Sequence, residues 1–192
     1  MENSLLMRTD ATFSLNFLIY IQNIFLNKKL SDEELKFPYI FTEVSFEEDF
    51  ELCYRTLWNE VAQRISENPL NDLKIFHEEK DLFYHSLFIE SDENLKDFNA
   101  IYLSFKIWWN SFAGRFSIER SIDEKGEKLY VEVANALVQK RIKPQKELNI
   151  SLIYDECLLA DPEVSSYFVV VSLKDIFVKF KETISKIQVR IK

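Results

Sequence analysis

The sequence predicts an α+β fold that is mainly helical, in which N-terminal amphipathic helices pack with a small antiparallel sheet and a C-terminal helix. Hydrophobic residues make up 47% of the 192 residues, enough for a packed core. Only two glycines and four prolines occur, which favours long helices over many short strands. Apolar residues follow a helical spacing before Gly114 and alternate after it. We therefore expect one globular domain over residues 1–192, helical over about 1–114 and mixed α/β over about 115–192.

The first helix is expected over about residues 11–26, with Thr9 or Asp10 as its N-cap. This stretch is apolar on more than one side, and such a helix usually lies in the centre of a core. Ser31 and Glu34 then match the capping-box pattern. A proline follows closely, so we expect only a short helical turn there.

Two helices are predicted next. Ser45 and Glu48 form a second capping box, and apolar residues recur at helical spacing after it, which predicts a helix over about 46–67. The Asn-Pro pair that follows ends this helix. The same spacing predicts a further helix over about 71–88.

A fourth helix is expected to begin near Ser91 or Asp92 and to end near Gly114. Its apolar residues alternate steps of three and four, as in a helix that packs on other helices. They are Leu95, Phe98, Tyr102, Phe105, Trp109 and Phe112.

Alternating apolar and polar residues after Gly114 predict a β-hairpin over about 115–122 and 128–134, with Gly126 supplying a positive φ in the turn. The same alternation predicts strands near 148–154 and 167–171. A helix over 151–159 is the alternative for the first of these, because short apolar runs are ambiguous.

The last element is expected to be a helix over about 173–188, capped by Ser172. Several classes of site are excluded by composition, since two glycines cannot form a phosphate-binding loop, a dinucleotide fingerprint or a nucleophile elbow. Cys53 and Cys157 form no CxxC pair, which is typical of reduced thiols. We find no secretory signal and no apolar run long enough to span a membrane, and we expect a cytoplasmic protein.

The charge is unevenly distributed. Residues 1–98 carry 20 acidic and 9 basic side chains, a net charge of −11, whereas residues 99–192 carry 12 acidic and 15 basic side chains, a net charge of +3. This pattern disfavours nucleic-acid binding and favours a basic protein partner. We therefore expect a small interaction protein, such as a regulator or an immunity or antitoxin-like protein. The composition suggests a low-GC bacterium or its phage.

The candidate partner-binding residues are Glu47, Glu48, Glu51 and Trp108. The first three belong to the acidic part of the chain. Trp108 lies next to Trp109 and therefore about 100° away from it on a helix, at the edge of the apolar face. An exposed tryptophan in such a place is a common interface anchor.

The alternative function is an enzyme or sensor that uses a divalent metal at His77, Asp81 and His85. Spacings of four and eight place these side chains along one side of a helix, and imidazole and carboxylate groups bind zinc or iron. The outer two would lie about 12 Å apart along the helix axis, too far to reach one ion without help. We therefore assign no catalytic residue, no metal ligand and no cofactor, and the oligomeric state stays open.

Overall fold

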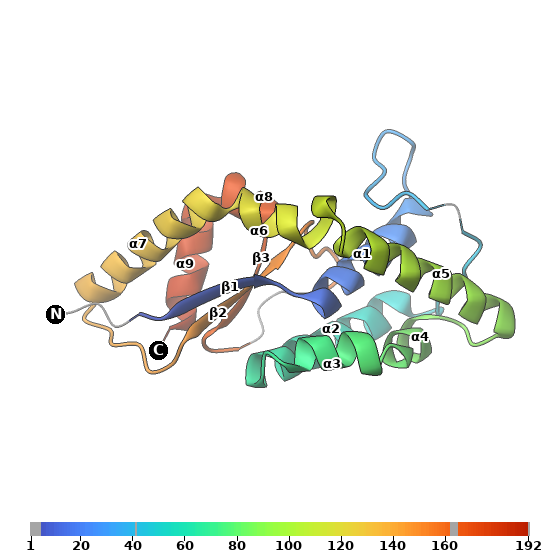
Figure 1. Cartoon of the computed structure of the whole chain (residues 1–192), viewed down its shortest axis with the longest axis horizontal. Coiled ribbons are helices and arrows are strands. Elements are labelled where there is room, and N and C mark those ends of the chain that lie inside the picture. Colours follow the sequence, from blue (N-terminus) through green and yellow to red (C-terminus); the bar gives the residue numbers. More distant parts are fainter. Residues whose placement is uncertain (1–4, 41, 162–164, 192) are drawn as a thin grey trace.

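Figure 1 shows the computed structural model, which describes residues 5–40, 42–161 and 165–191. The molecule has two halves. A bundle of helices forms one of them, and a three-stranded sheet with its own helices forms the other. The expectation of a mainly helical protein is confirmed. No helix in the described part of the chain is both long and apolar enough to cross a membrane.

The sheet contains β1 (Met7–Ala11), β2 (Leu148–Ile153) and β3 (Phe168–Ser172), in the order β1-β2-β3. Both strand pairs are parallel, so the prediction of an antiparallel sheet is wrong. Parallel neighbours need long crossover connections, and here most of the helical chain lies between β1 and β2. Strands near 148–154 and 167–171 are confirmed, and the helical alternative over 151–159 is wrong.

The predicted hairpin over 115–122 and 128–134 is also wrong. These residues form two helices, α6 (Ser117–Ser121) and α7 (Asp123–Gln139). The sheet therefore takes its third strand from the N-terminal segment that we expected to cap the first helix.

The spacing of buried residues explains the helical outcome. Leu129, Val133 and Leu137 recur every four residues and are all buried, whereas Val131, which the alternating pattern placed in the same row, is 51% exposed. Gly126 lies inside α7 without a positive φ, and its N–H donates to a carbonyl one turn earlier. A helical stripe is therefore the pattern that matches the core.

The helical half surrounds α1 (Phe13–Asn27), in which every residue from 13 to 24 is buried. The helices α2 (Phe50–Glu67), α3 (Asn71–Glu78) and α5 (Asp92–Trp109) pack against it. The ring of Phe17 lies at the centre of this packing. It contacts the rings of Phe76, Phe83, Phe98, Tyr102 and Phe105.

The predicted caps differ in outcome. Ser91 caps α5 as expected, because its Oγ accepts from the N–H of Asn94 at 3.1 Å. Ser45 does not cap α2, which begins only at Phe50. Instead the carbonyl of Ser45 accepts from the N–H of Ile89 at 3.2 Å, which keeps this segment extended.

Two predicted helices are each divided in two. The helix over 71–88 breaks between α3 and α4 (Asp81–Leu87), where the carboxylate of Glu79 turns to Arg64 of α2 at 2.7 Å. The C-terminal helix breaks between α8 (Leu173–Phe177) and α9 (Phe180–Arg190).

The cap of the C-terminal helix is confirmed. Ser172 and Asp175 form a full capping box at the start of α8, in which each side chain accepts from the other's backbone N–H.

The two halves are joined through the turn η1 (Phe112–Phe116), and Gly114 lies within it. A Cβ atom at Gly114 would come within 2.7 Å of the Trp109 carbonyl oxygen and closer still to that of Trp108. Gly114 therefore allows a close backbone approach five residues beyond the end of α5, and its φ of −89° is not the left-handed value of a helix stop.

Candidate functional site

Two acidic segments hold most of the excess negative charge. Residues 42–51 contain five carboxylates and no basic side chain, and residues 89–97 contain four carboxylates and one lysine. Their combined charge is −8, equal to the net charge of the whole chain. The rest of the protein is therefore neutral on balance.

Asn94 holds these segments side by side. Its Oδ1 accepts from the N–H of Ser45 at 2.8 Å, and its Nδ2 donates to the carbonyls of Ser45 at 2.7 Å and Ile89 at 2.6 Å. The side chain is buried, so these bonds are shielded from water. The two acidic segments thus form one surface at the N-terminal end of α5, beside α4 and far from the sheet (Figure 1).

A groove of about 860 Å³ runs along this surface. Its acidic lining comes from both segments, with Glu43 on one side and Glu93 and Asp97 on the other. Its apolar lining comes from Ile40, Ile89, Ala100 and Ile101. We name this feature, with those seven residues, the acidic groove. It combines negative charge with an apolar surface.

The charge of the groove is not neutralised within the protein. Of the nine carboxylates in the two segments, only Glu51 and Glu90 have a basic side chain within 4.0 Å among the described residues. Asp97 accepts a hydrogen bond from the hydroxyl of Thr42 at 3.2 Å, which does not cancel its charge. Exposed carboxylates without partners attract cations over a distance of about 10 Å at 0.1 M salt.

Lys28 lies beside the first acidic segment. Its ammonium donates to the carbonyl of Val44 and lies 5.2 Å from the ring centroid of Phe46. Burial lowers the pKa of Lys28, and the charge of Asp97 partly opposes that shift. Lys28 therefore anchors the 42–46 segment and does not pair directly with the carboxylates of the groove.

The structure brings some of the predicted residues to this surface. Glu47 and Glu48 lie in the first acidic segment, and Glu51 lies in the first turn of α2, 3.6 Å from Lys29. Trp108 lies elsewhere. It is 14 residues along α5 from Asn94, about 21 Å at 1.5 Å per residue.

The ring of Trp108 is half-buried in an aromatic cluster with Tyr20, Phe37 and Tyr154, at centroid distances of 6.0, 4.8 and 5.1 Å. Most of its surface is thus used within the chain. Trp108 and the three predicted glutamates do not form one site.

Glu43, Glu93 and Asp97 were not predicted. Each belongs to a run of acidic residues that looks like any solvated surface. The one available signal was Asn94, a polar residue on the buried side of a helix, but the sequence does not show which backbone it binds.

The predicted metal candidates do not share one helix. His77 lies in the last turn of α3, where its ring makes tilted and edge-on contacts with Phe13 and Phe76, whereas Asp81 and His85 lie on α4. His85 bonds to Glu90 at 2.8 Å. Among the described residues no three His, Cys, Asp or Glu side chains are placed to hold a metal ion.

The environment of Cys157 does not activate its thiol. Cys53 and Cys157 are both free and half-buried. Burial raises the pKa of Cys157 to about 11, so at neutral pH it is a protonated thiol.

No protein-family model, curated protein or solved structure matches this chain. The acidic groove is therefore judged on its geometry and charge.

Proposed function

We propose that this protein is an interaction protein that binds a basic protein partner through the acidic groove. The observation that carries the proposal is the groove itself, where two acidic segments meet over an apolar lining and keep seven carboxylates without a basic partner in the described chain. A cytoplasmic regulator of the immunity or antitoxin kind matches this chemistry.

The groove favours a segment rich in lysine and arginine. Such side chains can place their charged ends beside Glu43, Glu93 and Asp97 and lay their methylene stems on the apolar lining. A surface on which negative charges are concentrated also speeds the association of a basic partner at low salt. The same surface repels the phosphates of a nucleic acid.

The test uses a fluorescent arginine decapeptide as probe, with fluorescence anisotropy at 50 and 300 mM salt. We compare the wild type with the double variant Glu43→Lys and Glu93→Lys. The matched control is Glu124→Lys with Glu127→Lys on α7, two exposed residues that give the same change in net charge away from the groove. Exposed charge pairs contribute up to about 1 kcal/mol each.

We expect the groove variant to weaken peptide binding about 30-fold at 50 mM salt, and the control variant to weaken it less than 3-fold. The wild-type affinity should fall at 300 mM salt, because the contacts are exposed and screened. Equal losses in the two double variants would mean that only net charge matters, and the groove would then not be the binding surface.

A further inference from the structure

The two faces of the sheet differ in character. One face is apolar and buried, with Ile150 and Leu152 beside Val169 and Val171. The other is polar across β1 and β2. It carries Arg8, Asp10, Thr12, Asn149 and Ser151. Parallel sheets are normally apolar and covered on both faces, so a polar face is a departure that packing does not explain.

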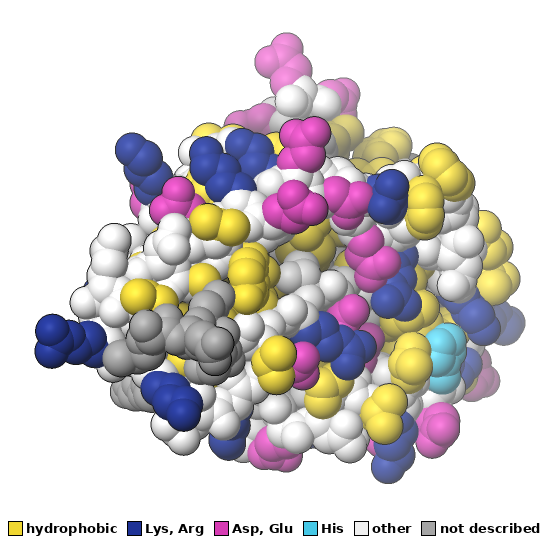
Figure 2. Space-filling view, turned by 60° about the vertical axis from the view of Figure 1, so that its left-hand side comes forward, with side chains coloured by type: hydrophobic (Ala, Val, Ile, Leu, Met, Phe, Trp, Pro, Cys, Tyr) yellow, Lys and Arg dark blue, Asp and Glu magenta, His cyan; other side chains and the backbone are white. Residues whose placement is uncertain are grey.

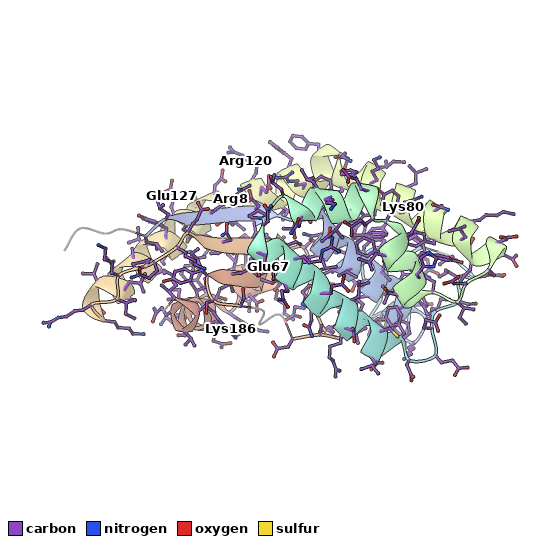
Figure 3. All side chains as sticks on the ribbon, turned by 90° about the horizontal axis from the view of Figure 1, so that it is seen from below. Arg8, Glu67, Lys80, Arg120, Glu127 and Lys186 are labelled. Atoms are coloured by element: carbon purple, nitrogen blue, oxygen red, sulfur yellow. The ribbon has the colours of Figure 1, made fainter. Side chains whose placement is uncertain are left out.

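A cavity of about 430 Å³ lies over this polar face. Its opposite wall is the junction of α2 and α3, which supplies Ile65, Leu70 and Leu73. Figure 3, seen from below, shows the end of α2 that carries Glu67 beside the strand that carries Arg8. The cavity therefore lies where the helical half meets the sheet, a common place for small-molecule sites.

Buried hydrogen bonds hold the cavity in shape. The carboxylate of Asp72, at the start of α3, accepts from the N–H groups of Phe13 and Ser14 at 2.8 Å each. The hydroxyls of Thr12 and Ser151 lie 2.7 Å apart and join the end of β1 to β2. Both walls are thus fixed before any ligand binds, which lowers the entropic cost of binding.

The polar wall keeps unused donors and acceptors. Arg8 bonds Asp10 and Arg115 bonds Glu119, each through Nε only, so the terminal guanidinium nitrogens have no hydrogen bond within the described chain. In the same part of the protein the side-chain amide of Asn149 makes no hydrogen bond either. This wall therefore offers free guanidinium donors and the donor and acceptor of one amide.

Charges of both signs line the cavity: Arg8 and Arg115 lie there together with Asp10, Asp72 and Glu147. Figure 2 shows basic, acidic and hydrophobic side chains together on one face of the molecule. A ligand with a net charge would meet a like charge within the same cavity. An uncharged ligand avoids that cost.

Polar groups with free hydrogen-bonding capacity lie mainly on the sheet wall. On the opposite wall the Asp72 carboxylate already accepts from Phe13 and Ser14, and Asn68 Oδ1 accepts from the N–H of Leu70. A sugar carries hydroxyls around its whole rim, whereas a nucleobase has a polar edge and two apolar faces. Amide, guanidinium and carboxylate side chains are those that pair with base edges, and apolar side chains such as Leu73 pack on base faces. We propose that this cavity binds an uncharged nucleobase or nucleoside, with its polar edge toward Arg8 and Asn149 and one face against Leu73.

The test is isothermal titration calorimetry of the full chain with adenosine, guanosine, cytidine and uridine in separate runs. Glucose and adenosine monophosphate serve as comparison ligands. We expect at least one nucleoside to bind with a Kd below 1 mM, and to bind more tightly than glucose and the charged nucleotide. Asn149→Ala should weaken that nucleoside about 10-fold, as expected for one or two lost hydrogen bonds.

Three further variants test whether binding is specific to the cavity. Leu73→Glu changes the opposite wall at a half-exposed side chain and should also weaken binding, so a folding defect of Asn149→Ala would not decide the outcome. Asn110→Ala, at an exposed asparagine after α5, should leave binding unchanged. The acidic-groove variant Glu43→Lys with Glu93→Lys should also leave it unchanged, which separates this proposal from the proposed function.

The proposal is overturned if no nucleoside binds below 1 mM or if glucose or the nucleotide binds more tightly. It is also overturned if binding survives both Asn149→Ala and Leu73→Glu.

Discussion

Replacing Asp72 by alanine should lower the free energy of unfolding by about 2 to 6 kcal/mol, since two buried N–H donors lose their acceptor. Asp72 accepts two backbone N–H groups at the start of α1, a role that the N-cap residue Thr12 does not fill with its own side chain. Loss of a cap costs about 1 kcal/mol, and a buried donor left without an acceptor costs about 1 to 3 kcal/mol. Alanine leaves two such donors in a region that the α3 backbone continues to cover.

The variant Asp72→Asn keeps the size of the side chain but removes its negative charge and one acceptor oxygen. Asparagine has one acceptor oxygen, so one of the two α1 N–H groups would face an NH₂ group instead. We expect a loss smaller than that of the alanine variant, about 1 to 2 kcal/mol at pH 7.

The pH dependence of the free energy of unfolding is a second test of the role of Asp72. Burial raises the pKa of Asp72, although the N–H groups of Ser14 and Phe13 and the charge of Arg115 oppose the shift. Between its ordinary value of 3.8 and that raised pKa, the folded state holds a proton that the unfolded chain has lost. The contribution of Asp72 to stability therefore falls as the pH rises through this window. Compared with Asp72→Asn, the wild type should gain stability on acidification.

The assay is urea unfolding followed by circular dichroism, with Asp81→Ala as matched control. Asp81 lies in the first turn of α4 and is exposed, so its loss should cost less than 1 kcal/mol. An Asp72→Ala variant within 0.5 kcal/mol of the wild type, or no more destabilised than Asp81→Ala, would refute the reasoning.

Three further predictions concern the two glycines, Cys157 and Glu156. Gly114→Ala should lower the free energy of unfolding by more than about 2 kcal/mol, because the backbone of α5 occupies the place of the new Cβ. Gly126→Ala should instead raise the free energy of unfolding by up to about 1 kcal/mol in the same urea assay, because the nearest atom to its Cβ would be 3.7 Å away and alanine favours the helix. Alkylation of Cys157, followed by mass spectrometry, should keep accelerating up to a pH of about 11, and a plateau near pH 8 would contradict this. Hydrogen bonds from Lys174 and Lys179 lower the pKa of Glu156, so its contribution to stability is present above its ordinary pKa of 4.5 and is lost as the pH falls through the lowered pKa. In thermal unfolding, Glu156→Gln should therefore cost under about 1 kcal/mol at pH 7 and progressively less as the pH falls below 4.5.

The sequence correctly predicted those helix starts that depend only on residues close by in the chain. The start of α5 at Ser91 and the capping box at Ser172 follow from side chains within three residues of the cap. The helix over 71–88 was predicted too long because its break depends on Arg64, on another helix.

The strand β1 could not be recognised from its own residues. Arg8, Thr9 and Asp10 are polar and resemble a helix cap, and they become a strand only by pairing with β2. The parallel arrangement depends on the same pairing.

The sequence predicts the negative charge of the acidic groove but not its shape. The acidity around Glu47 and Glu48 is visible in the sequence, but the groove exists because Asn94 binds backbone 49 positions away.

The origin of the three strands also has a consequence for the order of folding. Thr12 and Ser151, which touch across the sheet, are 139 positions apart in the chain. During synthesis the segments of α1 to α5 emerge long before β2, so β1 must wait without a partner. Its polar and charged residues reduce aggregation during this time, because a charged strand pairs poorly with other chains. We expect the sheet to form last, at a rate set by the closure of this long loop.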